Sequence, residues 1–155
     1  GLARNLGISK EEAGRFIDAY FKLYPGVRAW LDATLEQARE QGYVTTLLQR
    51  RRYLPELKSS DRNVRGAAER MAINTPVQGS AADIIKLAMI RLDEALRGMK
   101  AQLLLQVHDE LVVEADAAIA DKVAQTMRDM MENAMRLDVP LKVDVGIGNH
   151  WAEIH

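Results

Sequence analysis

The chain has 155 residues, 48% of them hydrophobic and 28% charged, and this size suits one domain, or two subdomains that share a core. The absence of cysteine excludes disulfides and thiolate metal sites, and the formal net charge of −1 excludes a protein that coats nucleic acid through bulk electrostatics. No apolar run approaches the ~20 residues of a membrane span and no targeting segment opens the chain, so we expect no membrane contact and a cytoplasmic location.

The first forty residues predict two consecutive helices. Ser9 and Glu12 have the spacing of a capping box, which favours a helix from there to about Tyr24. One face of this helix carries five apolar residues that we expect to lie in the core: Phe16, Ile17, Tyr20, Phe21 and Tyr24. Pro25 and Gly26 separate it from a second helix, which Gly42 is expected to end.

The segment from Tyr43 to Tyr53 predicts a short β-hairpin, because β-branched and aromatic residues replace the helical pattern. Three consecutive arginines lie near its end: Arg50, Arg51 and Arg52. Guanidinium groups match pairs of phosphate oxygens, so these arginines are candidates for nucleic-acid contacts. A solvated run of charge explains them equally well.

Residues 62–97 predict a long helix that is interrupted around residues 74–76, since proline lacks an N–H and disfavours helical geometry in the residue before it. Arg70, Asn74 and Gln78 are spaced by four and share one face among apolar neighbours. This polar stripe either forms a structural hydrogen-bond network or presents donors to a polar ligand such as a nucleic-acid groove.

Residues 101–116 carry the pattern most suggestive of chemistry. Two apolar runs flank His108, Asp109 and Glu110, which is typical of a tight β-hairpin with three polar residues at its tip. Adjacent carboxylates on a rigid hairpin can hold Mg²⁺, which prefers hard oxygen ligands. The simpler alternative is that polar residues occupy the turn because turns face water.

The C-terminal part predicts one more helix and one more strand. Residues 118–137 have helical apolar spacing, and their methionines are expected to fill gaps in the core. Residues 141–147 alternate between apolar and polar side chains, and we expect this strand to join the sheet of the hairpin at residues 101–115. The predicted fold class is α+β, with a small antiparallel sheet packed on long helices.

Three stretches together resemble the C-terminal part of the family A DNA polymerases, the family of bacterial DNA polymerase I. They are GYVTTLLQRRRYLPEL (residues 42–57), ERMAINTPVQGSAADIIK (residues 69–86) and LLLQVHDELVVEA (residues 103–115). Their order and spacing also match, and the likeness extends from Gly1 to His155. The resemblance implies that residues 1–60 belong to the fingers subdomain and residues 61–155 to the palm subdomain.

The resemblance also implies roles for individual residues. Asp109 would be one of two essential aspartates that bind a catalytic pair of Mg²⁺ ions, with Glu110 as an accessory carboxylate and His108 near the primer terminus. The polar stripe matches family positions that contact primer-template DNA. The three arginines resemble a family segment that lies close to bound DNA.

The sequence also departs from the family pattern. The other essential aspartate and the residues for the incoming deoxynucleoside triphosphate (dNTP) belong upstream of Gly1. We therefore interpret the chain as a C-terminal piece that needs the upstream part of the same polymerase, and we expect it to be inactive alone. The missing strand is expected to leave a sheet edge open to dimerisation. Gln49 stands where relatives often have glycine, a change that the loop is expected to tolerate.

The predicted function is template-directed DNA synthesis, in replication or repair, by two-metal nucleotidyl transfer from dNTP to the primer 3′-hydroxyl. The alternative is a non-catalytic DNA-binding or structural module. A generic metal-dependent hydrolase would need further ligands near Asp109, where the sequence offers only Glu110 and His108.

Overall fold

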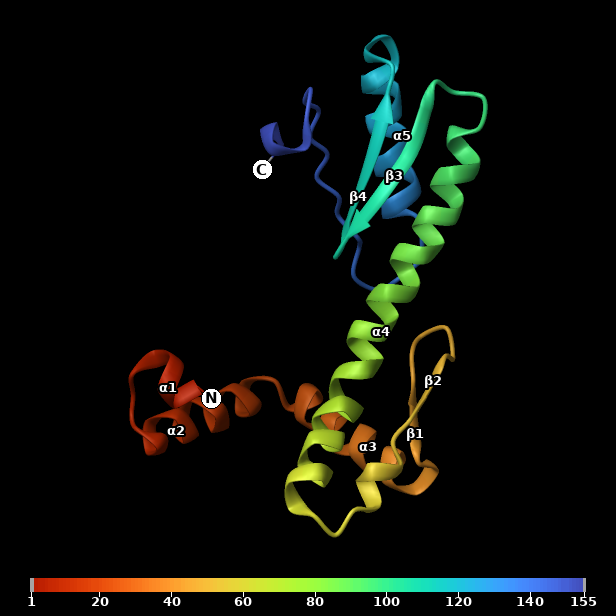
Figure 1. The fold of residues 1–155 in the computed structure, drawn as a ribbon. Helices are drawn as coiled ribbons and strands as arrows, with labels where there is room; N and C mark the ends of the chain where they lie inside the picture. Colours follow the sequence, from red (N-terminus) through yellow and green to blue (C-terminus); the bar gives the residue numbers. More distant parts are fainter. Residues whose placement is uncertain (1, 155) are drawn as a thin grey trace. The chain divides into compact units, whose positions relative to one another are not determined.

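A computed structural model describes residues 2–154 and divides the chain into two compact units (Figure 1). Unit 1 holds the residues up to Thr45 together with Gln49–Pro76, and unit 2 holds Thr46–Leu48 together with the residues from Val77 onward. Helices and small antiparallel sheets occur in the same chain, so the α+β prediction is confirmed. The division into fingers and palm at residue 60 stays a prediction.

Unit 1 begins with helices α1 (Leu2–Leu6), α2 (Lys10–Leu23) and α3 (Pro25–Gln41). The predicted capping box is present, because the Ser9 hydroxyl accepts a hydrogen bond from the Glu12 N–H and the Glu12 carboxylate accepts one from the Ser9 N–H. Gly42 ends α3 with a φ of 77°, the left-handed geometry that glycine adopts without steric cost.

The predicted arginine-rich hairpin is also present in unit 1. Strands β1 (Tyr43–Thr45) and β2 (Arg51–Tyr53) pair antiparallel and lead into the short 3₁₀ helix η1 (Pro55–Lys58). The core of the unit joins residues of α3, the hairpin, η1 and helix α4 (Arg62–Leu96): Ala38, Val44, Leu54, Leu57, Ala68 and Ala72. This packing holds the hairpin against α4.

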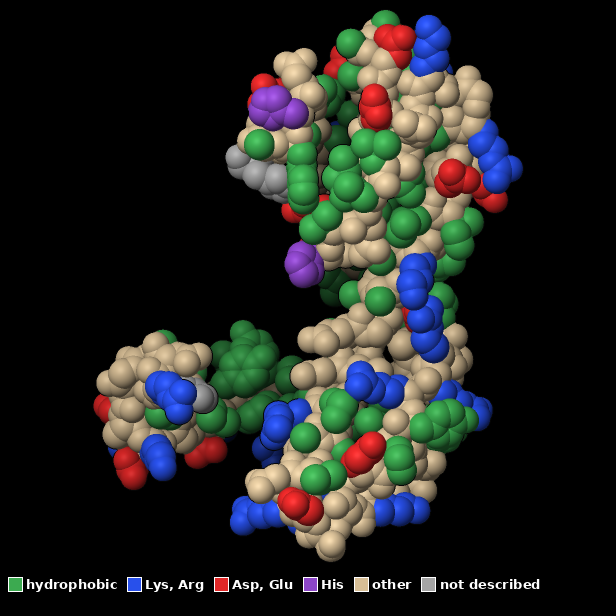
Figure 2. Space-filling model, in the orientation of Figure 1, with side chains coloured by type: hydrophobic (Ala, Val, Ile, Leu, Met, Phe, Trp, Pro, Cys, Tyr) green, Lys and Arg blue, Asp and Glu red, His purple; other side chains and the backbone are tan. Residues whose placement is uncertain are grey.

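The apolar stripe of α2 does not lie in a core, so that prediction is wrong. Phe16 is 61% exposed and Tyr20 is 50% exposed, whereas Ala13 is the buried residue of the helix. Figure 2 shows hydrophobic side chains gathered at the surface near the end of this helix. Helical periodicity shows which face of a helix is apolar, but it does not show which element packs on that face. In the described residues, most of the apolar stripe of α2 is left exposed.

Helix α4 runs without interruption through Pro76, so the predicted break at residues 74–76 is also wrong. The proline removes one backbone donor, but hydrogen bonds hold the helix before and after it. Arg52 donates to the Thr75 hydroxyl in unit 1, and the Leu47 N–H donates to the Ser80 hydroxyl in unit 2. Although α4 has 35 residues, no described helix combines the length and hydropathy that crossing a bilayer requires.

Unit 2 is built around a second hairpin of strands β3 (Ala101–Val107) and β4 (Glu110–Ala115). After the 3₁₀ helix η2 (Ala117–Ile119), helix α5 (Ala120–Glu132) packs with the hairpin and the end of α4 around one apolar cluster (Figure 1). Its buried members are Leu92, Leu96, Leu111 and Val123, and the methionines Met127, Met130 and Met131 pack against them. The expected core role is confirmed for these three methionines, whereas Met135, which follows the end of α5, is not among the residues packed against this cluster.

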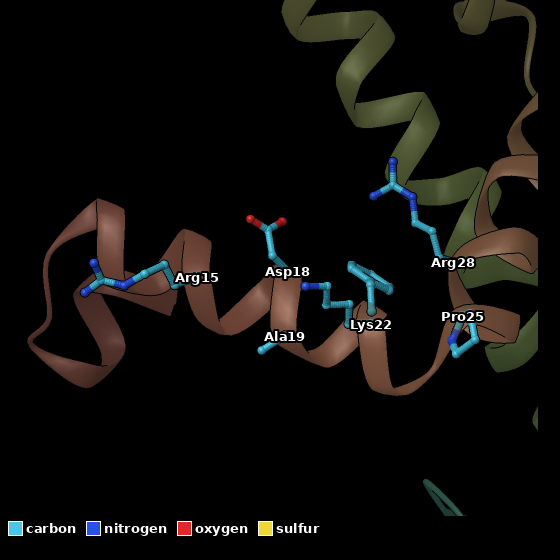
Figure 3. A pocket seen from close by; sticks show the side chains of 7 residues that line it. Arg15, Asp18, Ala19, Lys22, Pro25 and Arg28 are labelled. Carbon is cyan, nitrogen blue, oxygen red and sulfur yellow. The ribbon is translucent and has the colours of Figure 1, made fainter.

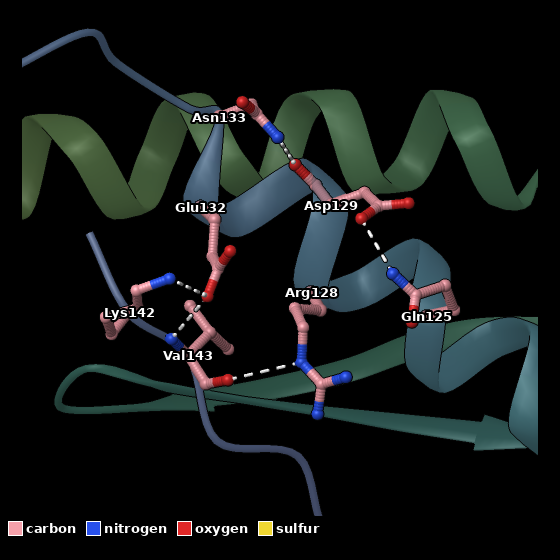
Figure 4. Close-up of polar contacts among 7 residues, drawn as sticks. All are labelled: Gln125, Arg128, Asp129, Glu132, Asn133, Lys142 and Val143. Carbon is pink, nitrogen blue, oxygen red and sulfur yellow. Dashed lines mark hydrogen bonds and ion pairs between the residues drawn. The ribbon is translucent and has the colours of Figure 1, made fainter. Parts of the chain in front are cut away.

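The last part of unit 2 differs from the prediction in two ways. Helix α5 ends at Glu132 instead of residue 137, and residues 141–147 form no strand. The segment is held by side chains of α5: the Val143 N–H donates to the Glu132 carboxylate at 3.2 Å, and the Val143 carbonyl accepts from Arg128 at 3.4 Å (Figure 4). A strand needs hydrogen bonds to the backbone of a neighbouring strand. Here the backbone of Val143 is hydrogen-bonded to side chains of α5 instead. The short 3₁₀ helix η3 (Trp151–Glu153) follows.

Candidate functional site

The candidate catalytic carboxylates lie at the tip of the β3–β4 hairpin. Val107 pairs with Glu110, so the connecting turn contains only His108 and Asp109. The register shifts at Leu104, which has no partner on β4 and forms a β-bulge. Leu111, only 8% exposed, fixes the base of the tip in the apolar cluster of unit 2. The hairpin therefore holds the turn on a packed support.

The turn itself is strained. His108 has a φ of 53°, in the left-handed region that residues other than glycine seldom adopt. The Gln106 side-chain amide donates a hydrogen bond to the His108 carbonyl at 2.5 Å and holds this conformation. Backbone strain of this kind is found most often at functional sites, where surrounding structure maintains it.

Asp109 and Glu110 are exposed, and they are neighbours in the chain at the point where β4 begins. Carboxylate oxygens are the ligands that Mg²⁺ prefers, and this ion commonly takes only one or two carboxylates from protein. Within residues 2–154, no group of three or more His, Cys, Asp or Glu side chains could enclose a metal ion. The tip can therefore supply part of a metal site, and the further ligands that a generic hydrolase would need are not among the described residues.

The polar stripe of Arg70, Asn74 and Gln78 lies on α4, and all three side chains are exposed. Arg70 and Asn74 belong to unit 1 and Gln78 to unit 2. In the described part of the chain, none of the three side chains takes part in a hydrogen bond or an ion pair. The structural network that was one explanation of the stripe is thus not formed there, and the exposed donors favour a contact with an external polar ligand.

The three consecutive arginines have different surroundings. The Arg51 guanidinium lies 4.7 Å from the centre of the Tyr43 ring, and the rings of Tyr43 and Tyr53 are 5.6 Å apart. A hydrogen bond to Tyr53, together with the nearby Tyr43 hydroxyl, raises the pKa of Arg51 above its ordinary value. Arg51 is therefore a permanently charged group on an aromatic support, with Arg50 beside it in the loop.

Arg52, on the opposite face of β2, contacts α4 in unit 1. It donates to the Thr75 hydroxyl at 3.3 Å and to the Met71 sulfur at 3.0 Å. Met71 and Thr75 each follow directly after a residue of the polar stripe, Arg70 and Asn74. The structure thus brings one predicted arginine to the same helical turns as two stripe residues.

Sequence reasoning missed a buried polar cluster in unit 2. The Thr46 hydroxyl donates to the Asp83 carboxylate at 2.6 Å, and both residues are buried, with 4% and 1% of their surface exposed. The Leu47 N–H donates to the hydroxyl of buried Ser80 at 2.9 Å. The two bonds fasten the loop between β1 and β2 to α4. The signal was a lone carboxylate, Asp83, in an otherwise apolar helical segment.

Comparison with known proteins identifies the family of the chain. The sequence matches the family described as DNA polymerase family A over residues 1–153. It is 53% identical over 152 residues to the thermostable DNA polymerase I of Thermus filiformis and 52% identical over 153 residues to the DNA polymerase I of Bacillus subtilis. These alignments cover 98% and 97% of the chain.

The same likeness is found among solved structures. The POL domain of Pol1 from M. smegmatis, in complex with DNA primer-template and dNTP, matches with a TM-score of 0.95 and 52% identity, over 99% of this chain and 28% of that one. The chain spans 18% of the Thermus filiformis polymerase and 17% of the Bacillus subtilis polymerase. It therefore corresponds to a small part of each relative.

Proposed function

Because the chain belongs to DNA polymerase family A, we propose that it is the C-terminal fingers and palm part of a bacterial DNA polymerase I. In that role it contributes to template-directed DNA synthesis in replication or repair. The observation that carries the proposal is the pair Asp109 and Glu110 at a strained two-residue turn, within a sequence that matches polymerases over almost its whole length.

The reaction joins the primer 3′-oxygen to the α-phosphorus of dNTP, breaks the bond to the β-phosphate oxygen and releases pyrophosphate. Two Mg²⁺ ions, when bound, supply the positive charge that activates the hydroxyl and stabilises the leaving group. Asp109 would hold a metal ion through its carboxylate, and Glu110 would be the accessory carboxylate beside it. The resemblance to the family assigns the second essential carboxylate to the upstream part of the same polymerase.

The primer-template DNA is held by exposed hydrogen-bond donors of the chain. We assign the polar stripe, Arg70, Asn74 and Gln78, to the DNA near the primer terminus, with His108 beside the terminal nucleotide. Amide and guanidinium groups suit the minor-groove acceptors that all base pairs share, so they can sense pairing geometry without reading sequence. Arg50, Arg51 and Arg52 bind the phosphate backbone, where permanent charge is most useful.

The upstream part of the same polymerase is the partner that this proposal requires. The exposed apolar stripe of α2 supports it, because Phe16 and Tyr20 present a surface that ordinarily seeks burial. We accordingly propose that the chain alone does not extend a primer, that its open sheet edges favour dimers when the partner is absent, and that the parent works in the cytoplasm. A non-catalytic DNA-binding module remains the alternative description of the isolated chain.

Primer extension tests the proposal directly. The chain is assayed with Mg²⁺, primer-template and all four dNTPs, first alone and then together with the upstream polypeptide of the parent. Extension only in the mixture is expected. Extension by the chain alone would contradict the assignment of the second carboxylate to the upstream part.

The substitution Asp109→Asn in the complete polymerase tests the catalytic residue. It should slow extension by about 10³-fold, because losing a metal ligand removes several kcal/mol of transition-state stabilisation. DNA affinity should be retained. Asp93→Asn is the matched control, since Asp93 is an exposed carboxylate on α4 that pairs with Arg97. Unchanged extension by Asp109→Asn would refute the role.

A further inference from the structure

The elbow between α2 and α3 in unit 1 forms an open pocket of about 800 Å³ that the proposed function does not use (Figure 3). Figure 3 shows side chains from both helices around it. Its lining consists of Arg15, Asp18, Ala19, Phe21, Lys22, Pro25 and Arg28. Three of these side chains are cationic and one is a carboxylate, so the lining carries an excess of positive charge in a chain whose net charge is −1.

Two of the three cations of this pocket make no side-chain contact that stabilises the described part of the chain. In the part of the chain that the structure describes, neither Arg15 nor Lys22 forms an ion pair or a side-chain hydrogen bond. The pocket therefore has unneutralised charge available for an external ligand.

Arg28 is held in place by two contacts. Its Nε donates to the Asp32 carboxylate at 2.9 Å, and its guanidinium lies 5.3 Å from the centre of the Phe21 ring. A fixed guanidinium loses little freedom when it binds a phosphate, and its plane also offers a surface on which a base can stack. Proteins that bind single-stranded nucleic acids combine cationic side chains with aromatic side chains on which bases stack.

We propose that this pocket binds the sugar-phosphate backbone of the unpaired template strand. The inference rests on the proposed function, because a template-directed polymerase must always hold a strand that is not yet paired. Arg15, Lys22 and Arg28 contact successive phosphates, and Asp18 at the rim weakens the interaction. The pocket is separate from the polar stripe and the hairpin tip, whose proposed ligands are the paired DNA and the reacting groups.

The test uses the complete polymerase and fluorescence-detected binding to two substrates that differ only in the template 5′ overhang, one nucleotide or twelve. The double variant Arg15→Gln/Lys22→Gln should bind the long-overhang substrate about tenfold more weakly, while its affinity for the short one is unchanged. The salt dependence for the long overhang should decrease by about 1.4 in the slope of log K against log salt, at ~0.7 for each single-strand phosphate neutralised.

Two further variants make the result unambiguous. Asp18→Asn should tighten binding of the long overhang only, a gain that misfolding cannot imitate. Lys58→Gln removes an exposed charge outside the pocket and should change neither substrate. An equal loss on both overhangs, or no loss on either, overturns this inference. Failure of the parent to bind or extend any primer-template would instead overturn the proposed function.

Discussion

The buried hydrogen bond between Thr46 and Asp83 offers the sharpest test of what holds the arginine-rich loop on α4. In Thr46→Val the shape of the side chain is kept but the hydroxyl that donates to the carboxylate at 2.6 Å is lost. A hydrogen bond to a charged group contributes ~1.5 to 3 kcal/mol. In the variant, water cannot reach the buried Asp83 carboxylate to replace the lost donor. Since both residues are at least 96% buried, we expect a loss of about 2 to 3 kcal/mol.

Urea unfolding of the variant and wild-type chains measures this difference. Thr46→Ser keeps the hydroxyl and loses one methyl group, so it should cost only about 1 kcal/mol. Thr126→Val is the matched control, because the Thr126 hydroxyl donates to the Lys122 carbonyl on α5, and its loss should cost below ~0.5 kcal/mol. A Thr46→Val chain as stable as wild type, or a Thr46→Ser chain as unstable as Thr46→Val, would refute the reasoning.

Three other substitutions probe local features, each by urea unfolding. Gly14→Ala, within α2 and with open space around the added Cβ, should stabilise the chain by ~0.5 to 1 kcal/mol, and a loss would mean that the site is more crowded than it is here. Gly146→Ala should destabilise by ~1 to 3 kcal/mol, because the new Cβ would lie 2.2 Å from the Ile154 side chain; an unchanged midpoint would contradict that contact. Gln49→Gly should stabilise by about 0.5 to 1 kcal/mol, since Gln49 has a φ of 62°, and a decrease would show that this conformation carries no strain.

Local signals in the sequence predicted the parts of the fold that local chemistry determines. The capping box at Ser9, the left-handed glycine at Gly42 and the two hairpins all depend on neighbours within a few residues. Helix α5 was predicted because its apolar face repeats at helical spacing, and Val123 on that face is 3% exposed. In these cases the residues that determine the local structure all lie within the sequence pattern that predicted it.

The predictions that failed needed information about distant partners. Residues 141–147 have the sequence alternation of a strand, and residues 141–145 do alternate between half-buried and exposed. A strand, however, forms only if another backbone lies alongside. Pro76 was expected to break α4, yet contacts on both sides maintain the helix. The α2 stripe predicted burial and could not reveal what would cover it.

The position of the candidate site depends on the pairing register of β3 and β4. A two-residue turn leaves no slack between β3 and β4, so the position of Asp109 is determined by which residues pair below it. A slip of one residue would turn Leu111 out of the apolar cluster of unit 2 and turn the charged Glu110 toward it, which is unfavourable. Turn chemistry alone would have placed glycine at position 108, because φ is positive there. Because histidine occupies that strained position, the Gln106 hydrogen bond to the His108 carbonyl and the packing below the turn must together keep the carboxylate in place.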